Sequence, residues 1–298
     1  MRFSMFKRLW SNRGANETTT STIEEMIPTI VASALLEMQE GEVVRPLVTN
    51  IPFPGPGIIH QTPFVTILTS EADDSLSNQA IDTSGSAETS PSAATVGVHG
   101  ATVMVKEIAE LGAVDNVAAM AGRLIGQCVT LRREQDLVAL FTGWTNQGSA
   151  NVDITPGDLY DAYASLRTAI APLPYFLVMH PGNIWSSVGL ISLFDNSSDA
   201  IQTRGPGTVG EEWARTGFAG MALGFQLYAS AAITVTSNNA SGGAFSREAI
   251  KFVSKRPFRI DVMQDVKEVG VQISGTEMWG EATLRGTFGN EMQFNQQA

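Results

Sequence analysis

The stretch VDNVAAMAGRLIGQCVTLRREQDLVALFTGW, residues 114–144, predicts one long helix that begins at about Asp115 and ends near Gly143. Its apolar residues recur at spacings of three and four, which is the pattern of a helix that buries one face. The residues of this stripe are Val117, Met120, Ala121, Leu124, Ile125, Cys128 and Leu131. We expect Cys128 to be a small core residue, and the run RREQD at residues 132–136 to form a charged face in solvent. At about 1.5 Å per residue the helix would be on the order of 45 Å long, against a mean of about 11–12 residues for helices in general.

Two strand patterns flank a polar stretch upstream of this helix. Residues 64–69 (FVTILT) form the first pattern. Alternating valines at residues 96–105 form the second, with a change of phase at His99 and Gly100 that indicates a bulge. The stretch between them, residues 71–94, contains no aromatic residue and no Lys or Arg. Because loops longer than about 12–15 residues are uncommon inside compact domains and usually functional or disordered, the sequence predicts a long, protruding hairpin-like loop.

The N-terminal part is predicted to be a helix followed by an extended arm. Residues 22–39 fit a helix, with Ser21 as its candidate N-cap and Pro28 as a kink near its start. Residues 41–57 contain four prolines, which excludes a regular helix there. An extended segment of this kind suits an arm that lies over other structure or over another subunit.

Downstream of the long helix the patterns mix helices and strands. We expect a helix at residues 155–171, a buried strand at 176–179 and a helix at 184–193. The sequence SNNASGG at residues 237–243 is predicted to be a turn or an exposed loop. Period-two alternation over residues 258–286 predicts several neighbouring strands packed against the long helix. The fold class that follows is α+β.

The composition narrows the classes of protein. A net charge of −11 argues against a conventional DNA-binding domain, which has a basic footprint. Cys128 is the only cysteine, so the chain can form neither an intrachain disulfide nor a zinc site built from cysteines. No apolar run approaches the about 20 residues that span a bilayer, so no membrane contact is expected. The first 13 residues include four basic side chains and are expected to be a mobile basic N-terminus.

The residue types used in catalysis or metal binding do not gather in any pattern. The three histidines, His60, His99 and His180, are far apart and none forms a ligand-spaced pair. His180 follows the expected strand at 176–179, where a histidine hydrogen-bonded locally is the best explanation. The glycine-rich stretch at residues 205–210 lacks the Gly-Lys-Ser/Thr of a P-loop, and no G-x-S-x-G nucleophile motif is present. We therefore predict no catalytic residue, no cofactor, no metal site and no enzymatic activity.

Three segments give the chain its resemblance to a known family. VRPLVTN at residues 44–50 looks like the arm segment that precedes the extended loop in the major capsid proteins of tailed bacteriophages, the Hong Kong 97-type shell proteins. Residues 99–144 are similar to their loop-return strand, spine helix and closing stretch, here with Asp136 and Gly143. AIAPLPYFLVMHPGNIWSSV at residues 169–188 is similar to the strand and helix that enter their axial domain.

The resemblance implies the Hong Kong 97-type capsid fold. This is an α+β fold with an N-terminal arm, an extended β-hairpin loop, a long spine helix, and peripheral and axial domains. On this layout the arm would be residues 1–56 and the extended loop residues 57–106. The peripheral domain, with the spine helix, would be residues 107–150 and 241–298, and the axial domain residues 151–240.

The resemblance also implies a function. The chain would be a coat protein that self-assembles through hexamers and pentamers into the icosahedral head shell of a tailed phage, enclosing double-stranded DNA. Assembly would take place in the cytoplasm of the bacterial host, and the protein would end up in the virion. Portal, scaffolding and cement or decoration proteins would be further partners, and packaged DNA would be contacted non-specifically. Whether the basic N-terminus contacts DNA or a scaffolding protein stays open.

Charged residues are the candidate contacts between subunits. The acidic candidates, on the loop, are Glu71, Asp73, Asp74, Asp82 and Glu88, and the basic candidates on a neighbouring subunit are Arg132, Arg133, Lys251 and Lys255. Because exposed ion pairs are screened over about 8–10 Å at ordinary ionic strength, assembly through these pairs should depend on salt.

Residues 60–100 contain no Lys, and the nearest one is Lys106. Some shells of this family are locked by a covalent bond from a lysine in the extended loop. We expect no such cross-link here, so mature shells should run as single chains, without covalent ladders, on a denaturing gel.

Three other interpretations of the sequence remain open. The nearest is an encapsulin-like compartment of the same fold, which stores a cargo enzyme in place of a genome. An α+β enzyme would need a convergent polar cluster. An adhesin or other structural protein would be expected to be all-β and secreted.

Overall fold

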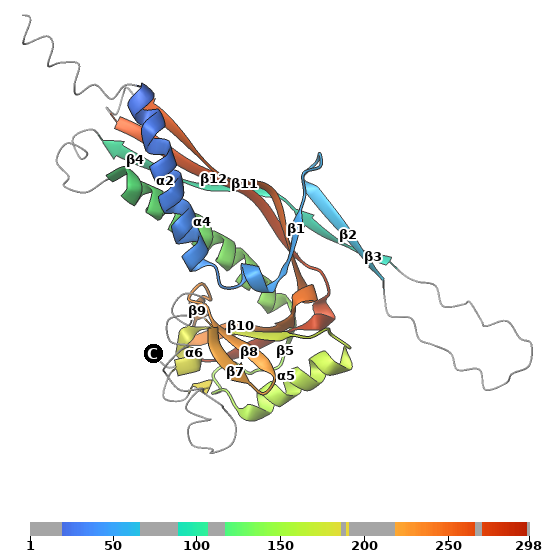
Figure 1. Ribbon diagram of the computed structural model, residues 1–298. Coiled ribbons are helices and arrows are strands. Elements are labelled where there is room, and N and C mark those ends of the chain that lie inside the picture. Colours follow the sequence, from blue (N-terminus) through green and yellow to red (C-terminus); the bar gives the residue numbers. More distant parts are fainter. Residues whose placement is uncertain are drawn as a thin grey trace, which may run out of the picture. The chain divides into compact units, whose positions relative to one another are not determined.

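The computed structural model describes residues 20–65, 89–106, 117–185, 189–190, 218–265 and 270–296 (Figure 1). The chain divides into two compact units. One comprises Met1–Gly41, His99–Leu131 and Phe258–Glu277, and the other comprises Glu42–Val98, Arg132–Pro257 and Met278–Ala298. No helix in the described ranges is long and apolar enough to cross a membrane.

The structure combines helices and strands, as expected for an α+β fold. The helices are α2 (Thr20–Gly41), α4 (Val117–Ala139), α5 (Pro156–Thr168) and α6 (Pro181–Trp185), with short 3-10 helices η1 (Arg45–Leu47), η2 (Leu140–Gly143), η3 (Arg247–Ala249) and η4 (Gly286–Phe288). The strands before α4 are β1 (Thr49–Pro52), β2 (Ile59–Val65), β3 (Thr89–Thr95) and β4 (Gly97–Lys106). The strands after α4 are β5 (Thr145–Asn146), β6 (Tyr175–Met179), β7 (Phe218–Ala222), β8 (Phe225–Ala229), β9 (Val235–Thr236), β10 (Asn239–Ser246), β11 (Ile250–Asp265), β12 (Gly270–Thr283) and β13 (Gly289–Asn295).

The strands of the described ranges form three sheets. A four-stranded sheet has the order β1-β11-β12-β4, and a seven-stranded sheet has the order β5-β13-β10-β6-β8-β7, with β9 beside β10. The third sheet is a two-stranded ribbon of β2 and β3.

The predicted N-terminal helix is confirmed as α2, with an earlier start. Because the helix already begins at Thr20, Ser21 lies inside it and is not its N-cap. Pro28 is accommodated within the helix. The predicted arm is extended only in part: η1 forms one short turn, and β1 then pairs in parallel with β11, with Thr49 opposite Lys251.

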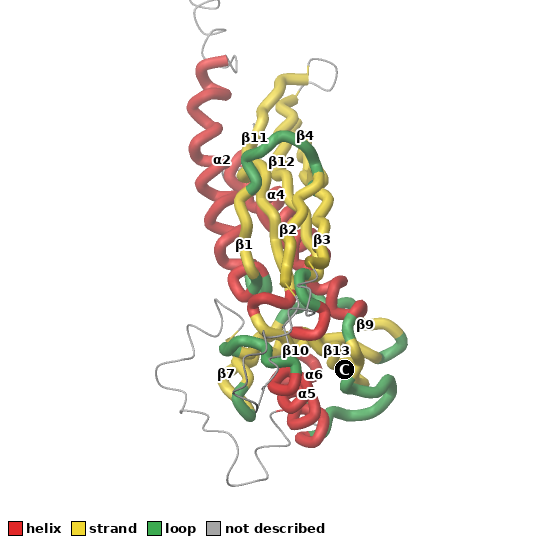
Figure 2. Tube along the Cα trace, turned by 90° about the vertical axis from the view of Figure 1, so that its right-hand side faces the viewer, coloured by secondary structure: helices red, strands yellow, loops and turns green. Residues whose placement is uncertain are grey.

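The helices α2 and α4 lie side by side, as both views show (Figures 1 and 2). Their closeness depends on glycine. A Cβ atom built on Gly122 would come within 2.6 Å of the carbonyl oxygen of Ile30, and one on Gly126 equally close to that of Ala34. Such distances are sterically excluded, so only glycine lets the two backbones pack at this spacing.

The face that α4 buries is not the predicted one. Ala121 and Ile125 are buried, as expected, and Ile125 meets Gly275 of β12, which confirms strand packing against this helix. Val117 is half-buried, and the remaining members of the predicted stripe point outward: Met120 is 54% exposed, Leu124 56% and Leu131 50%, and Cys128 is exposed as well. Glycines and small residues occupy the contact with α2, which displaces the bulky apolar residues to the opposite side.

The polar run at residues 132–136 was expected to lie in solvent, and this is wrong for its middle. Arg133 is fully buried and Glu134 is 2% exposed. The predicted end of the helix is confirmed, because α4 continues as η2 to Gly143. The predicted start at Asp115 lies outside the described residues.

A hairpin-like pair of strands is present, but its second strand is not the predicted one: β2 pairs antiparallel with β3, whereas the predicted strand at residues 96–105 is β4, which pairs with β12. The register of β2 and β3 runs from Ile59 opposite Thr95 to Val65 opposite Thr89. The first strand therefore begins earlier than the predicted 64–69, and residues 66–88, which include most of the polar stretch, lie outside the described residues. A break at Val96 separates β3 from β4.

The predicted bulge at His99 and Gly100 is not present, because β4 runs through both residues without a break. The glycine has another role. A Cβ atom on Gly100 would overlap the carbonyl oxygen of Gly275 on β12. Gly100 thus permits a close approach of two strands, which is the second common reason for glycine within a strand.

The predicted loop at residues 237–243 is mostly strand. Only Ser237 and Asn238, with φ of 50° and 62°, form a turn, the two-residue kind that joins tight hairpins, here between β9 and β10. Residues 239–243 belong to β10, which pairs with both β13 and β6. A Cβ atom on Gly243 would lie 2.8 Å from the ring of Phe141, so glycine here makes room for an aromatic side chain.

The remaining predictions in this region are confirmed in outline. The predicted helix at 155–171 is α5, whose start is fixed by Asp158: its Oδ2 accepts hydrogen bonds from the backbone N–H and the hydroxyl of Thr155, at 2.8 and 2.7 Å. The predicted strand at 176–179 is β6, which is buried along its length. Of the helix predicted at 184–193, residues 184–185 belong to α6, and residues 186–188 and 191–193 lie outside the described residues.

Candidate subunit-contact sites

The root of the β2–β3 ribbon is held by Lys251 of β11. Its side chain is fully buried, and Nζ donates hydrogen bonds to the hydroxyl of Thr62 at 3.1 Å, to the carbonyl of His60 at 3.4 Å and to the carbonyl of Ser92. Thr62 and His60 belong to β2 and Ser92 to β3. One ammonium group therefore ties both strands of the ribbon to β11, and its three donors are all used, as a buried charge requires. Burial lowers the pKa of Lys251 from its ordinary value.

A second lysine of β11 lies four residues further on. Nζ of Lys255 donates to the carbonyl of Gly57 and lies 5.2 Å from the ring centroid of Phe53, a cation–π distance. Phe53 in turn meets the His60 ring edge-on at 5.1 Å. Burial, and then the charge of Lys251, lowers the pKa of His60.

The junction between α2 and β1 is built around Glu134 of α4. The carboxylate accepts hydrogen bonds from three successive backbone N–H groups: Val43 at 3.3 Å, Val44 at 2.9 and 3.1 Å, and Arg45 at 3.3 Å. Successive N–H groups that converge on one anion form a backbone nest. Burial nevertheless dominates and raises the pKa of Glu134 from 4.5 to about 7.

Glu42 joins two arginines beside this nest. Its Oε1 lies 2.8 Å from Nη1 of Arg45 and 2.7 Å from Nη2 of Arg133. Both guanidinium groups also stack near aromatic rings, Arg45 at 5.0 Å from the centroid of Phe252 and Arg133 at 5.8 Å from that of Trp279. The chain leaves α2 and enters β1 through this network, so the network fixes the direction of the segment.

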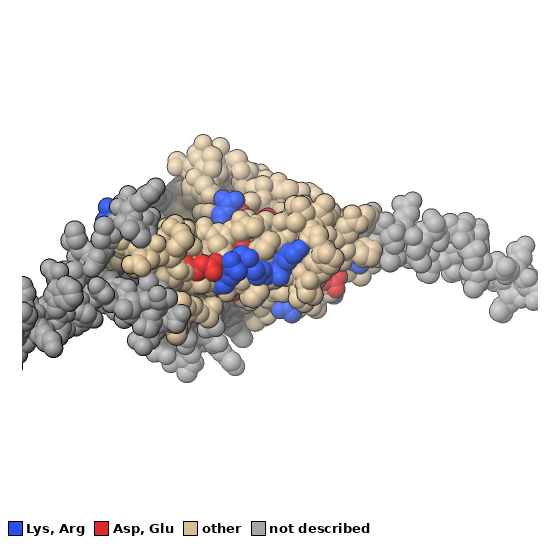
Figure 3. Space-filling view, turned by 90° about the horizontal axis from the view of Figure 1, so that it is seen from above, with Lys and Arg blue, Asp and Glu red and all other residues tan. Residues whose placement is uncertain are grey.

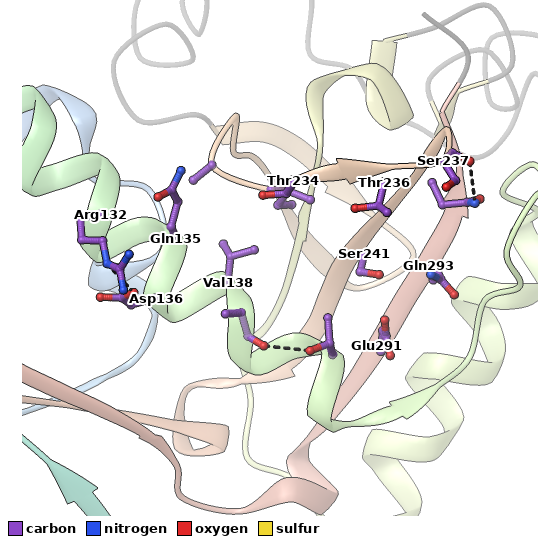
Figure 4. Close-up of a pocket in the computed structure, with 15 residues that line it drawn as sticks. Arg132, Gln135, Asp136, Val138, Thr234, Thr236, Ser237, Ser241, Glu291 and Gln293 are labelled. Carbon is purple, nitrogen blue, oxygen red and sulfur yellow. Dashed lines mark hydrogen bonds and ion pairs between the residues drawn. The ribbon is translucent and has the colours of Figure 1, made fainter.

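A polar groove of about 900 Å³ lies over the face of β10 and β13 (Figure 4). Its floor contains Ser241, Glu291 and Gln293, and one wall is the end of α4 with η2. The other wall is the segment that leads into β9 and the β9–β10 turn. The residues that line the groove are Arg132, Gln135, Asp136, Val138, Ala139, Thr142, Ala232, Ile233, Thr234, Thr236, Ser237, Asn239, Ser241, Glu291 and Gln293.

Comparison with known proteins gives matches at the level of structure. No protein-family model and no curated protein matches the sequence. The capsid of Ralstonia phage GP4 matches with a TM-score of 0.67 at 8% identity, covering 85% of this chain and 88% of that one. The capsid of cyanophage P-SCSP1u matches with a TM-score of 0.61 at 14% identity, covering 84% and 87%. A virus-like particle from Pyrococcus furiosus matches with a TM-score of 0.58 at 11% identity, covering 89% and 98%.

The chain has the fold of a phage capsid protein. The α+β class and the Hong Kong 97-type resemblance predicted from the sequence are thereby confirmed at the level of fold. Most of both chains is covered in each match. The likeness shows the architecture alone, because at identities of 8–14% most aligned residues differ in type.

Within this capsid fold the predicted contact residues fall into three groups. The acidic candidates Glu71, Asp73, Asp74, Asp82 and Glu88 lie outside the described residues. Arg132 is exposed and pairs with Asp136 at 2.9 Å, and Lys255 lies at the root of the ribbon. Their role toward a neighbouring subunit stays a prediction.

Arg133 and Lys251 were expected to offer surface charges, and the capsid fold corrects this. Both side chains are fully buried, and both charges are bound within their own chain. They position elements, Arg133 the junction after α2 and Lys251 the ribbon.

Sequence reasoning also missed Glu134 and Glu291. Glu134 follows Thr130 by four residues and precedes Val138 by four, all three buried on α4. This spacing was the signal that the carboxylate belongs to a buried stripe.

His180 has the local surroundings that the sequence predicts. The backbone N–H of Gly182 donates to Nδ1 of His180 at 3.1 Å, which is the local hydrogen bond expected of a strand-end histidine. Burial lowers its pKa. The described residues contain no group of three or more His, Cys, Asp or Glu side chains that would hold a metal ion.

Proposed function

We propose that the chain is the major capsid protein of a tailed phage and assembles through hexamers and pentamers into an icosahedral head shell around double-stranded DNA. The observation that supports this most directly is the likeness to phage capsids over 84–85% of the chain. On this proposal the protein is structural, has no catalytic activity and binds no cofactor. It works in the virion after assembly in the bacterial cytoplasm.

The layout of the capsid fold suggests a role for each part. Residues 1–56, with α2 and β1, serve as the arm, and residues 57–106, with the β2–β3 ribbon, as the extended loop. Residues 107–150 and 241–298, with α4 as the spine helix, make the peripheral domain, and residues 151–240 make the axial domain.

The physical argument for assembly comes from the ribbon. A two-stranded sheet is marginal in water without a further surface to pack against. The described part of the β2–β3 ribbon is joined to no third strand. Ala94 of β3 is buried against Val253 of β11, but Ile58, just before β2, is 58% exposed and Ile59, its first residue, is 53% exposed. A neighbouring subunit would cover these apolar residues, and many such contacts spread over a shell give closure without one very tight interface.

The net charge of the chain indicates how it would contact DNA. The chain has a net charge of −11, so DNA inside the shell is confined by packaging and contacted non-specifically. On the face drawn in Figure 3 most of the described surface is uncharged, and acidic and basic groups lie beside one another in a short row. Contacts through such a face would be mostly uncharged. Portal, scaffolding and cement proteins are further proposed partners.

Electron microscopy of the purified protein tests the proposal. Closed icosahedral particles are the expected result. A protein that stays monomeric at all concentrations contradicts the proposal. Nuclease-protected DNA inside particles from infected cells supports a phage head. Particles that enclose a folded enzyme and no genome support the encapsulin-like alternative instead.

A further inference from the structure

The groove over β10 and β13 is rich in hydrogen-bond acceptors. Arg132 lies in its wall, but this guanidinium is paired with Asp136 at 2.9 Å, so the two charges cancel. Thr142 already donates its hydroxyl to the carbonyl of Ala139 at 3.0 Å, a contact drawn in Figure 4. The charge that remains in the groove is the carboxylate of Glu291 on its floor.

Glu291 is the unusual residue of this groove. It is only 9% exposed, and no hydrogen bond or ion pair of its carboxylate is formed with the part of the chain that the structure describes. The carboxylate oxygens are not among the fully buried unpartnered atoms, so they keep contact with the solvent in the groove and present a negative charge there that no basic side chain of the described residues pairs with. Figure 4 shows Glu291 directed from the sheet into the groove. The site therefore favours a cationic group that donates several hydrogen bonds.

We infer that this groove receives the basic segment of residues 1–14 of a neighbouring copy, with one of its cations paired to Glu291. The inference rests on the proposed shell assembly, which brings copies together. The segment MRFSMFKRLWSNRG contains Arg2, Lys7, Arg8 and Arg13, four of the 19 basic residues in a chain of 298. The comparably basic stretch at residues 247–259 belongs to η3 and β11 and so cannot enter the groove as an extended peptide. Charge complementarity therefore selects residues 1–14 as the occupant.

The walls suit an extended peptide. β9 pairs with β10 over two residues only, and the exposed Thr236 lines the groove together with Thr234. Hydroxyl groups of Thr236 and Ser241 add acceptors along its length. A nucleic-acid phosphate is disfavoured at the same place, because its charge has the same sign as that of Glu291.

Site-specific photo-cross-linking in assembled, full-length shells tests the inference. The photo-reactive residue p-benzoylphenylalanine replaces Thr236, and shells are assembled from a mixture of ¹⁵N-labelled and unlabelled copies. The expected product joins residue 236 of one copy to residues 1–14 of another, recognised by mass as a heavy–light pair. The same label at Tyr160, an exposed residue of α5 outside the groove, should give no product with residues 1–14.

Charge variants then test the pairing. In the Thr236-labelled protein, Glu291→Gln should lower the yield of this product about tenfold, as the loss of one charged hydrogen-bonded pair predicts. The matched change Glu248→Gln, at an exposed carboxylate on η3, should leave the yield unchanged. Changing the four basic residues of the segment to Gln should lower the yield as much as Glu291→Gln does. Because this variant leaves the groove unchanged, it still tests the pairing if the Glu291 variant fails to fold.

Three outcomes overturn the inference. They are no product with residues 1–14, a product only within one copy, or a product with another polypeptide such as a scaffolding protein. If microscopy shows closed particles, the proposed function holds under each of these three outcomes. The absence of closed particles contradicts the proposed function itself.

Discussion

Glu134 shows how one buried carboxylate can make stability depend on pH. Its pKa is raised from 4.5 to about 7 by burial, although three backbone N–H groups bind it. The folded protein therefore holds the proton more tightly than the unfolded chain does. Stability from this group is complete below pH 4.5 and is lost as the pH rises through about 7.

Glu134→Gln should remove this pH dependence. The amide oxygen still accepts from the N–H groups of Val43 to Arg45, while the charge is gone. In the unassembled subunit, the fall in unfolding free energy between pH 5 and 8 should become smaller by up to about 3 kcal/mol. Urea unfolding at both pH values measures it, with the exposed Glu248→Gln as the control. An equal fall in unfolding free energy between pH 5 and 8 in the wild type and in Glu134→Gln would contradict the assignment.

Lys251 is the second residue whose charge has a structural role. Lys251→Met keeps most of the side-chain volume but leaves the hydroxyl of Thr62 and two backbone carbonyls without their donor. We expect a loss of about 2–4 kcal/mol, together with faster amide exchange in β2 and β3. The matched change Lys255→Met, at a half-buried lysine with one carbonyl partner, should cost about 1 kcal/mol or less. A Lys251→Met protein with unchanged ribbon protection would show that the ribbon is held by other contacts.

At the scale of elements, the contact between α2 and α4 depends on two glycines. Gly126→Ala would place a methyl group 2.6 Å from the carbonyl oxygen of Ala34, so the helices must separate. Despite the better helix propensity of alanine, we expect a loss of about 1–3 kcal/mol in unfolding free energy. Gly143→Ala is the control, because a methyl group there meets nothing within 4 Å. Equal thermal unfolding of the two variants would argue against tight packing of α2 on α4.

The existence of the elements followed from the sequence better than their faces did. The spacing of apolar residues identified α4, and alternation identified β11 and β12, because both patterns are local. The buried side of α4 was misassigned because Gly122 and Gly126 pack without contributing apolar side chains, while Leu124 and Leu131 remain exposed. SNNASGG was misassigned because small residues signal loops, although in β10 they make room for Phe141.

The candidate sites were still less predictable. Nothing in the local sequence around Lys251 says that its side chain is buried, since its partners are about 160–190 residues away in the chain. Arg133 and Glu134 stand in a run of charges that ordinarily faces solvent. Their burial depends on Glu42 and on the N–H groups of Val43 to Arg45, which meet them only in the folded structure.

At the scale of the whole molecule, exposed apolar residues should matter for assembly and not for folding. Ile59, 53% exposed at the start of the ribbon, is the most direct test. Ile59→Ser should change the unfolding free energy by no more than about 0.5 kcal/mol, as usual for a surface substitution, and should sharply lower the yield of closed particles. Val152→Ser, at a residue of similar exposure (48%), is the control. An equal yield from the Ile59 variant and the wild type would remove the ribbon from the contact between subunits.

Cys128 was expected in the core and instead lies on the outside of α4. Since it is the only thiol in the chain, a maleimide dye added to the free subunit attaches at one known place. The number of fluorophores per particle, counted by stepwise photobleaching or absorbance, then equals the copy number. Shell size can thus be read with a spectrometer, before any map of the particle exists.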